Sequence, residues 1–320
     1  MISIIICSAN ATYYAQVSAS IAQTIGVEYE LIQIENSANT YSIFEAYNLG
    51  VLQAKYSIVC FAHEDILFHT PNWGAHLITH FNDETIGLIG VIGATVFPQC
   101  PSAWWSSTLI NDHLVNNIQH WTDGVSKQPY HTIISQTKQL TITRDYNNPT
   151  NNNVVDAAVV DGLFFAIRKQ LFNEHKIRFD TDNFKSFHCY DSDIALQVNQ
   201  HMRVVVVFDI LVEHLQQGTI NKAWYDSVLI LAKKWNNTLP ILKKEVTNTE
   251  QYNYYETEVL KTFVYWMQGS GYYNSKEIAN VIAYFLPLIP LNKLNRKNKK
   301  ELYCIQLLGP KLGRIHKLIP

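Results

Sequence analysis

The fold is decided by the stretch Tyr56-Ser-Ile-Val-Cys-Phe-Ala-His-Glu-Asp65, in which an apolar run meets three ionisable side chains. An apolar run of this length predicts a buried strand. In open α/β sheets, ligands bind outside the carboxyl ends of the strands. Core packing gives no reason to place His63, Glu64 and Asp65 there, because buried charges are costly unless they are paired or metal-bound. These three residues therefore predict a ligand site, and the alternative interpretation is a solvated loop after a strand.

Outward from this stretch, strands and helices alternate along the first part of the chain. Apolar runs predict strands, and apolar residues spaced three to four apart predict helices. The first predicted helix ends at Gly26, and the second begins with the capping box of Ser42 and Glu45. The predicted strands are 2–7, 29–34 and 56–62, and the predicted helices are 13–25 and 42–55. This alternation predicts two right-handed crossovers and a mostly parallel sheet flanked by helices.

The pattern weakens between residues 97 and 153, where Asn, Thr, Ser and Gln are frequent. So long a stretch predicts a functional region rather than a structureless loop. Further strands are predicted at 86–94, 137–143, 154–160, 163–167 and 203–208, and further helices at 73–81, from Asp191 to about 201, and at 224–235, 250–269 and 275–285. We expect an α/β domain over residues 1–245 and a helical, basic C-terminal appendage over residues 246–320.

Composition narrows the class of protein. The net charge of −2 over 320 residues argues against a nucleic-acid binder. The five cysteines include no Cys-x-x-Cys pair, which argues against a disulfide framework or a zinc knuckle and fits a reducing compartment. The chain begins without a basic, signal-like segment, and no apolar run reaches the roughly 18–20 residues of a membrane span. We expect a cytoplasmic protein.

The C-terminal segment carries a separate signal. Residues 291–320 hold eight Lys or Arg residues against the single acid Glu301. They follow the apolar stretch 282–291, which is interrupted by Pro287 and Pro290. An apolar segment beside basic residues predicts docking on an anionic membrane surface. The alternative interpretation is a solvated appendage or a dimer contact.

The turn after the first strand excludes two common nucleotide-binding classes. It reads Ser8-Ala-Asn-Ala-Thr12 and contains neither G-x-G-x-x-G nor Gly-Lys-Ser. Dehydrogenases and P-loop enzymes are therefore disfavoured, and bound phosphates would need a metal to neutralise them. Asp65 is the best ligand candidate, because a hard carboxylate oxygen suits Mg²⁺ or Mn²⁺ carrying a diphosphate.

Six motifs in order resemble the family 2 type of nucleotide-sugar glycosyltransferases with the GT-A fold, and in particular its bacterial glycosyltransferase-like branch. The motifs are Ile2-Ser-Ile-Ile-Ile-Cys-Ser8, Glu35-Asn36, Ala46-Tyr-Asn-Leu-Gly50, His63-Glu-Asp65, Asp161-Gly-Leu-Phe-Phe-Ala166 and Phe187-His-Cys-Tyr-Asp-Ser-Asp193. The resemblance covers about residues 1–240. It implies a GT-A-like, Rossmann-type sheet with a nucleotide-sugar half over about 1–95 and an acceptor half over about 96–245.

The resemblance also implies a metal site. Asp65 occupies the last position of the family's D-x-D motif and would bind Mn²⁺ or Mg²⁺ at the donor diphosphate. The first position is His63 rather than Asp, which departs from the usual two-carboxylate site. His214 matches a position that completes the metal site in several relatives, and its alternative role is a hydrogen-bonded histidine at a strand end.

Donor and acceptor positions follow from the same resemblance. The donor-binding candidates are Ser8, Glu35, Asn48, His63, Glu64, Asp65, Asp161 and Gly162, with Ser8 and Glu35 lining the base and ribose pocket. Glu35 could equally be a surface turn residue, and Asp161-Gly162 could be a tight turn. The acceptor-binding candidates are Trp104, Trp105 and Asp193, and the two tryptophans either stack on a sugar or pack in the protein.

Asp191 matches the aspartate of the family's Glu-Asp pair and would be the general base, with Tyr190 in place of the Glu. Asp193 is the second candidate, and either residue could simply cap a helix. A carboxylate base contributes roughly 10²–10⁴ in rate, and a divalent cation stabilises the leaving diphosphate.

The function expected from these residues is inverting transfer of a sugar from a UDP-sugar to a glycan or lipid-linked saccharide of a bacterial surface polysaccharide. The enzyme would lie in the cytoplasm or peripherally on the inner face of the plasma membrane. The alternatives are a sugar nucleotidyltransferase and a catalytically degenerate GT-A-fold binding protein.

Overall fold

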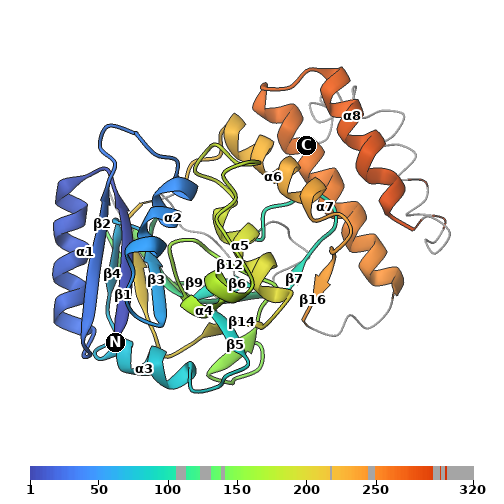
Figure 1. Cartoon of the computed structure of the whole chain (residues 1–320). Helices are drawn as coiled ribbons and strands as arrows, with labels where there is room; N and C mark the ends of the chain where they lie inside the picture. The colour runs from blue at the N-terminus through green and yellow to red at the C-terminus, as the bar shows by residue number, and fades with distance from the viewer. Residues whose placement is uncertain are drawn as a thin grey trace. The chain divides into compact units, whose positions relative to one another are not determined.

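A computed structural model of the chain divides into two compact units (Figure 1). It describes residues 1–105, 113–122, 131–137, 141–216, 218–243 and 249–290, together with Arg296 and Lys300. The first unit comprises Met1–Thr95 and Leu114–Thr219, and the second comprises Val96–His113 and Ile220–Pro320. This division differs from the expected boundary at residue 245, because the segment after Thr95 and the helix after Ile220 pack with the C-terminal helices.

The main sheet of the first unit has seven strands. In spatial order they are β11 (Val154–Asp156), β14 (Arg203–Val207), β5 (Ile86–Gly90), β13 (Phe164–Arg168), β3 (Ile58–Ala62), β1 (Ile2–Ser8) and β2 (Tyr29–Glu35). Strand β1 lies between β2 and β3 and is parallel to both, as the alternation predicts. Strand β13 is antiparallel to both β3 and β5, and β11 is antiparallel to β14. The sheet is therefore mostly parallel with two reversed strands.

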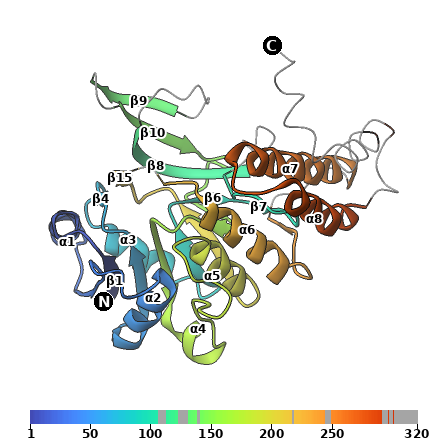
Figure 2. The same ribbon diagram turned by 90° about the horizontal axis from the view of Figure 1, so that it is seen from above.

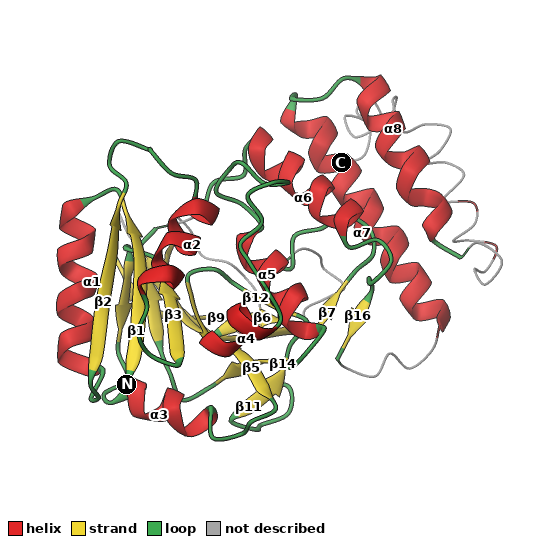
Figure 3. Cartoon of the chain, in the orientation of Figure 1, coloured by secondary structure: helices red, strands yellow, loops and turns green. Residues whose placement is uncertain are grey.

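Helices cover both faces of this sheet. Side chains alternate along β1, so Ile2, Ile4 and Ile6 share one core with the buried faces of α1 (Ala11–Thr24) and α3 (Trp73–His80). On the other face lie α2 (Ile43–Gln53), α4 (Lys169–Glu174) and α5 (Tyr190–Asn199). There the ring of Tyr47 packs 4.9 Å from Phe61 of β3 and 5.5 Å from Tyr190. The result is a three-layer α/β/α arrangement (Figure 3).

Local signals place the helix ends as expected. Ser42 and Glu45 form the reciprocal capping box of α2. Asn10 is the N-cap of α1, and its side chain accepts hydrogen bonds from the N–H groups of Thr12 and Tyr13. Gly26 follows the end of α1 with a φ of +68°, a left-handed conformation that favours glycine.

A second sheet completes the first unit (Figure 2). Its strands are β12 (Val159–Val160), β6 (Ile92–Ala94), β8 (Leu114–Thr122), β10 (Thr141–Asn147) and β9 (His131–Gln136), and β15 (Val212–His214) pairs with both β8 and β4 (Ile66–Phe68). Two apolar runs cross from one sheet to the other. The predicted strand 86–94 is therefore divided into β5 and β6, and the predicted strand 154–160 into β11 and β12. The predicted strand 137–143 overlaps β10 in residues 141–143, Thr137 follows the end of β9, and residues 138–140 lie outside the described part of the chain.

The second unit is largely helical. It contains α6 (Lys222–Lys234), α7 (Thr249–Ser270), α8 (Ser275–Phe285), the 3-10 turn η2 (Leu286–Leu288) and the small pair of β7 (Val96–Phe97) with β16 (Ile241–Leu242). Trp224 of α6 packs on Phe263 and Trp266 of α7, which explains why α6 belongs to this unit. Among the described helices, none has the length and apolarity needed to cross a bilayer.

The apolar stretch that begins at residue 282 is used inside the second unit. Ile282, Phe285, Leu286 and Ile289 are all buried there. The hydrophobic half of the expected membrane-docking segment is thus occupied by internal packing. Most of the basic residues that follow lie outside the described residues.

Candidate active site

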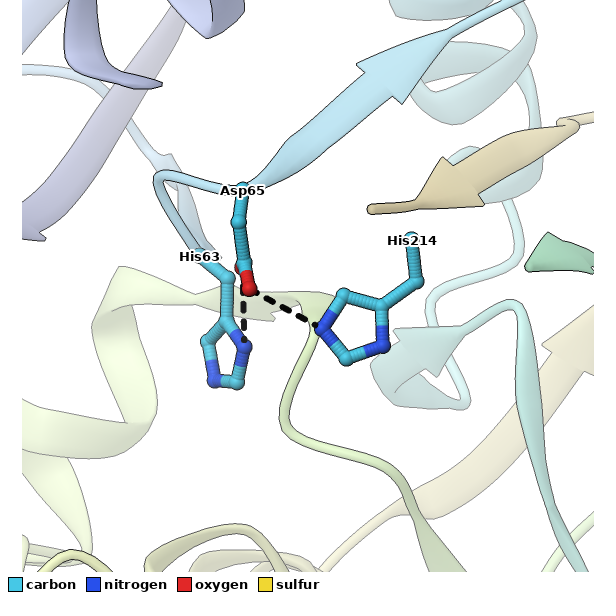
Figure 4. Close-up of side chains that lie close together, drawn as sticks. All are labelled: His63, Asp65 and His214. Atoms are coloured by element: carbon cyan, nitrogen blue, oxygen red, sulfur yellow. Dashed lines mark ion pairs between the residues drawn. The ribbon is translucent and has the colours of Figure 1, made fainter. Parts of the chain in front are cut away.

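Three side chains that could bind one metal ion converge in the first unit, beyond the carboxyl end of β3 (Figure 4). The ligand atoms of His63, Asp65 and His214 all lie within 4.8 Å of one another. Asp65 lies between the two histidines, with Oδ1 3.7 Å from His63 Nδ1 and Oδ2 3.4 Å from His214 Nε2. The structure thus brings the two predicted metal ligands, Asp65 and His214, together with His63, the residue that departs from the family's D-x-D motif.

Backbone pairing fixes these three positions. Strands β4 and β15 are antiparallel, and their register sets His214 opposite Ile66, next to Asp65. The N–H of Leu215 donates to the carbonyl of Asp65 at 2.9 Å. On the other side, the N–H of His63 donates to the carbonyl of Leu163 at 2.9 Å. The residues 63–65 therefore form a short bridge between the two sheets that is held at both ends.

The electrostatics of the cluster favour an anionic carboxylate. Burial opposes the charged form of Asp65, but the adjacent imidazoles of His214 and His63 outweigh it and lower the pKa of Asp65. Burial likewise disfavours the imidazolium of His214, yet the contact with Asp65 raises the pKa of His214. For His63 burial dominates, and its pKa is lowered. Burial and the contacts within the cluster thus favour an anionic Asp65 and a neutral His63.

The donor set fits a divalent cation. Two imidazole nitrogens and a carboxylate oxygen are ordinary ligands for borderline transition metals, and a site with only three protein ligands leaves positions open for substrate oxygens. His63, Asp65 and His214 are each partly exposed, so a ligand can reach them.

Asp191 is the second reactive group at this sheet edge. Its Oδ2 accepts a hydrogen bond from Gly162 N at 3.0 Å and its Oδ1 accepts one from Ser192 N at 2.7 Å. Burial, and next the charge of Asp161, raise the pKa of Asp191 to about 7. Gly162 is required by close approach, because an added Cβ would lie 2.1 Å from Tyr190 Oη.

Tyr190 and Asp161 connect the carboxylate with the metal-ligating cluster. The hydroxyl of Tyr190 lies 2.5 Å from His63 Nε2. Asp161 accepts a hydrogen bond from Leu163 N at 2.9 Å, and its charge acts on His63, His214 and Asp191. The predicted donor residues Asp161 and Gly162 therefore lie beside the predicted base.

Two site neighbours were not anticipated as such from the sequence. Tyr190 was noted only as a departure from the Glu-Asp pair, and Phe187 only as part of a motif. The ring of Phe187 is 51% exposed and its centroid lies 5.5 Å from that of His63. The two aromatic residues in the four positions before the predicted base were the available signal.

Glu64 is hydrogen-bonded to Ser8 and to the backbone of the turn that follows it. Oε2 of Glu64 accepts hydrogen bonds from Ser8 Oγ at 2.9 Å, Ala9 N at 3.1 Å and Asn10 N at 2.9 Å. This ties the end of β3 to the turn that begins α1. Their predicted contact with the donor stays a prediction.

Other predicted residues lie apart from the cluster or have other partners. Glu35 is exposed and accepts a hydrogen bond from Ser37 N, and the amide of Asn48 bonds both backbone groups of Phe179. Asp193 is fully buried and accepts from Gln197 Nε2 at 2.9 Å. Their predicted roles in donor or acceptor binding stay predictions.

The two tryptophans of the predicted acceptor site belong to the second unit. Trp104 is buried, whereas Trp105 is 40% exposed and packs 5.7 Å from the ring of Trp266. The burial of Trp104 and the ring contact of Trp105 agree with the alternative interpretation, and acceptor binding by them stays a prediction.

The Rossmann-type sheet and the acidic site at its carboxyl edge define the class of GT-A glycosyltransferases. Over residues 3–246 the sequence matches the Glycosyltransferase like family. The chain belongs to this family, which confirms the predicted fold class and the predicted identification as a glycosyltransferase. No match to the sequence is found among curated proteins.

Several solved structures share the fold. S. aureus TarS matches with a TM-score of 0.55 and 10% identity, over 98% of this chain and 53% of that chain. The structure of TarS 1-349 with UDP-GlcNAc matches with a TM-score of 0.53 and 12% identity, over 99% and 91%. GalNAc-T7 with UDP, GalNAc and Mn²⁺ gives a TM-score of 0.47 and 12% identity, over 80% and 54%. The chain spans about half the length of GalNAc-T7 and of the longer TarS structure.

Proposed function

We propose that this protein is an inverting, metal-dependent glycosyltransferase that transfers a sugar from a nucleotide-diphospho-sugar to a saccharide acceptor. The observation that supports it most is that a candidate metal site and a candidate general base lie at the same edge of the sheet. The candidate ligand atoms of His63, Asp65 and His214 lie within 4.8 Å of one another, and Tyr190, whose hydroxyl lies 2.5 Å from His63 Nε2, directly precedes Asp191 in the chain.

Asp65 and His214 would hold the cation, Mn²⁺ or Mg²⁺. A divalent cation at this position stabilises the charge that develops on a leaving diphosphate. Asp65 is suited to this role because the adjacent imidazoles keep its pKa low, so that it stays anionic as a ligand. The two backbone ends of the 63–65 bridge hold the carboxylate in place before substrate arrives.

Asp191 would act as the general base. Its carboxylate takes the proton of the acceptor hydroxyl while that oxygen forms a bond to the anomeric carbon and the bond from this carbon to the diphosphate oxygen breaks. A single displacement of this kind inverts the anomeric centre. A pKa raised to about 7 matches a base to neutral pH better than an ordinary aspartate does.

UDP is the proposed donor nucleotide. The support is a likeness of fold to TarS 1-349, which was crystallised with UDP-GlcNAc. A thermal-shift screen of UDP-, GDP- and dTDP-sugars, each with Mn²⁺ and with EDTA, tests the donor, since a ligand that binds the native state raises the midpoint. Release of UDP from the stabilising sugar nucleotide, abolished by EDTA, would then test the reaction.

The outcome that would contradict this proposal is equally direct. If no sugar nucleotide stabilises the protein with any divalent cation, donor binding is refuted. If pyrophosphate is released from a nucleoside triphosphate and a sugar phosphate, the protein is a nucleotidyltransferase. Donor binding without UDP release in the presence of any saccharide acceptor would indicate a binding protein.

A lipid-linked acceptor and contact with the inner face of the plasma membrane are part of the proposal. The support is the basic segment 291–320, in which Arg296 and Lys300 are exposed. Replacing Lys293, Arg296, Lys297, Lys299 and Lys300 together by Gln should reduce pelleting with vesicles that contain phosphatidylglycerol. Neutral vesicles are the control, and equal pelleting of both proteins would refute membrane contact through this segment.

A further inference from the structure

The two positions at which this chain departs from the family pattern touch each other. His63 stands where the pattern has the first aspartate of D-x-D, and Tyr190 stands where it has a glutamate. These residues are far apart in sequence, yet Tyr190 Oη lies 2.5 Å from His63 Nε2. Because both residues that depart from the family pattern are in direct contact, we expect His63 and Tyr190 to act together.

The contact determines which nitrogen of His63 faces the cluster. Nε2 is engaged by Tyr190, and Nδ1 points at Asp65, with 3.7 Å between Nδ1 and Oδ1. When the phenol oxygen accepts the Nε2–H, the lone pair of the imidazole lies on Nδ1, on the side of Asp65 and His214. Histidine ligands of metals are commonly oriented by an outer partner of this kind on the second nitrogen.

Packing holds Tyr190 in this position. Tyr190 is buried, its ring packs against Tyr47 and Phe44, and the absence of a side chain at Gly162 leaves the space that its hydroxyl occupies. The hydroxyl is therefore presented to His63 by a rigid aromatic cluster, and a small change in it would be felt by the imidazole ring.

We infer that His63 is a third metal ligand through Nδ1, that Tyr190 positions it, and that the resulting site of two nitrogens and one oxygen selects transition metals over Mg²⁺. Imidazole ligands suit first-row transition metals, whereas Mg²⁺ is bound by oxygen. The inference rests on the proposed metal site of Asp65 and His214, and it adds the identity of the third ligand and the class of cation.

The test uses the full chain, from which any bound metal is first removed. Mn²⁺ is then added, and its binding is measured by electron paramagnetic resonance. Tyr190→Phe should weaken Mn²⁺ binding by about 10–100-fold, and His63→Ala by at least as much. Pulsed spectra should show two imidazole nitrogens on bound Mn²⁺ in the native protein and one in His63→Ala. His63→Asp should bind Mg²⁺ better relative to Mn²⁺ than the native protein does.

Matched controls separate ligation from general damage. His76→Ala removes a histidine of the same unit that pairs with Asp209, and Tyr56→Phe removes a hydroxyl that bonds Glu28 at 3.2 Å. Neither should change Mn²⁺ affinity. Thermal midpoints in EDTA identify any variant that fails to fold, and Tyr190→Phe keeps the buried ring in place.

The outcomes distinguish the inference from the proposed function. Unchanged Mn²⁺ binding in Asp65→Ala and His214→Ala would refute the proposed metal site itself. Loss of binding in those variants, with native affinity in His63→Ala and Tyr190→Phe, would refute only the third ligand. A single imidazole nitrogen in the native spectrum, or a preference for Mg²⁺ in the native protein, would also overturn the inference.

Discussion

Two carboxylates that accept backbone N–H groups, one in each unit, show how similar hydrogen bonding serves different purposes. In the second unit Glu256 accepts hydrogen bonds from Gln99 N at 2.6 Å, Cys100 N at 3.0 Å and the hydroxyl of Tyr252. In the first unit Asp191 also accepts two backbone N–H groups. Burial raises the pKa of both carboxyl groups.

The difference lies in what surrounds each carboxylate. Glu256 is 3% exposed, and the bonds from Gln99 N and Cys100 N join the 96–105 segment to α7, so Glu256 serves as an anchor. Asp191 is partly exposed and lies near the like charge of Asp161 and beside the metal-ligating cluster. A carboxylate enclosed by donors stabilises the fold, whereas one that faces another carboxylate and solvent is available for proton transfer.

The strongest test of this comparison is Asp191→Asn. We expect the rate of sugar transfer to fall by roughly 10²–10⁴, because the amide cannot accept the acceptor proton. Steady-state kinetics with the donor found by thermal shift would measure it. Asp226→Asn is the matched control, since Asp226 lies in the second unit and pairs with Lys222. Near-native turnover in Asp191→Asn would exclude it as the base.

Glu256→Ala probes the other side of the comparison. The change leaves the N–H groups of Gln99 and Cys100 buried without their acceptor, so we expect a loss of about 3 kcal/mol in the free energy of unfolding. Urea denaturation would measure it. Glu258→Ala, on the same helix and in a partly exposed pair with Lys261, should cost less than Glu256→Ala, because water can reach the groups that it leaves. Equal effects of the two changes would contradict the anchoring role.

Glu64→Ala sharpens the comparison within the active-site bridge. Loss of the bonds from Ser8, Ala9 and Asn10 should lower the free energy of unfolding by about 1–3 kcal/mol. Because Glu64 points toward α1 and Asp65 toward the histidines, Mn²⁺ affinity should change little. Calorimetry and Mn²⁺ titration would measure the two effects, and a strong loss of metal binding would show that Glu64 belongs to the metal site.

The smallest expected effect concerns pH. Asp191 must be ionised to accept a proton, and its pKa is raised to about 7. The value of kcat/KM, measured with metal saturating, should therefore be constant above this pH and fall about tenfold per pH unit below it. Asp226→Asn should leave the profile unchanged. A profile that stays flat down to pH 5 would show that no group with this pKa limits the reaction.

Much of the fold was predictable because its signals are local. The apolar run ending at Ala62, the capping box of Ser42 and Glu45, and the left-handed Gly26 each specify an element within a few residues. The crossing of chains between two sheets was not predictable, since an apolar run such as 86–94 has the same pattern whether or not it changes sheets. Strand β9 was missed, and only the first residues of β10 were predicted, because both strands are largely polar.

The candidate site divides in the same way. Asp65 and His214 were predicted as metal ligands from motif position, and the structure places them together. The contact of Tyr190 with His63 depends on tertiary packing around Gly162, which no spacing in the sequence expresses. Whether a polar residue faces a ligand or the protein, as with Glu64 and Asn48, likewise depends on partners far away in the chain.

The bridge from Ala62 to Ile66 has a consequence for how this site can vary. It joins a strand of one sheet directly to a strand of the other, and both strands have fixed registers. Adding or removing one residue there would turn the side chains of one strand to the opposite face. Homologous chains that keep both sheets should therefore differ at positions 63–65 by substitution, and length differences should be confined to loops elsewhere.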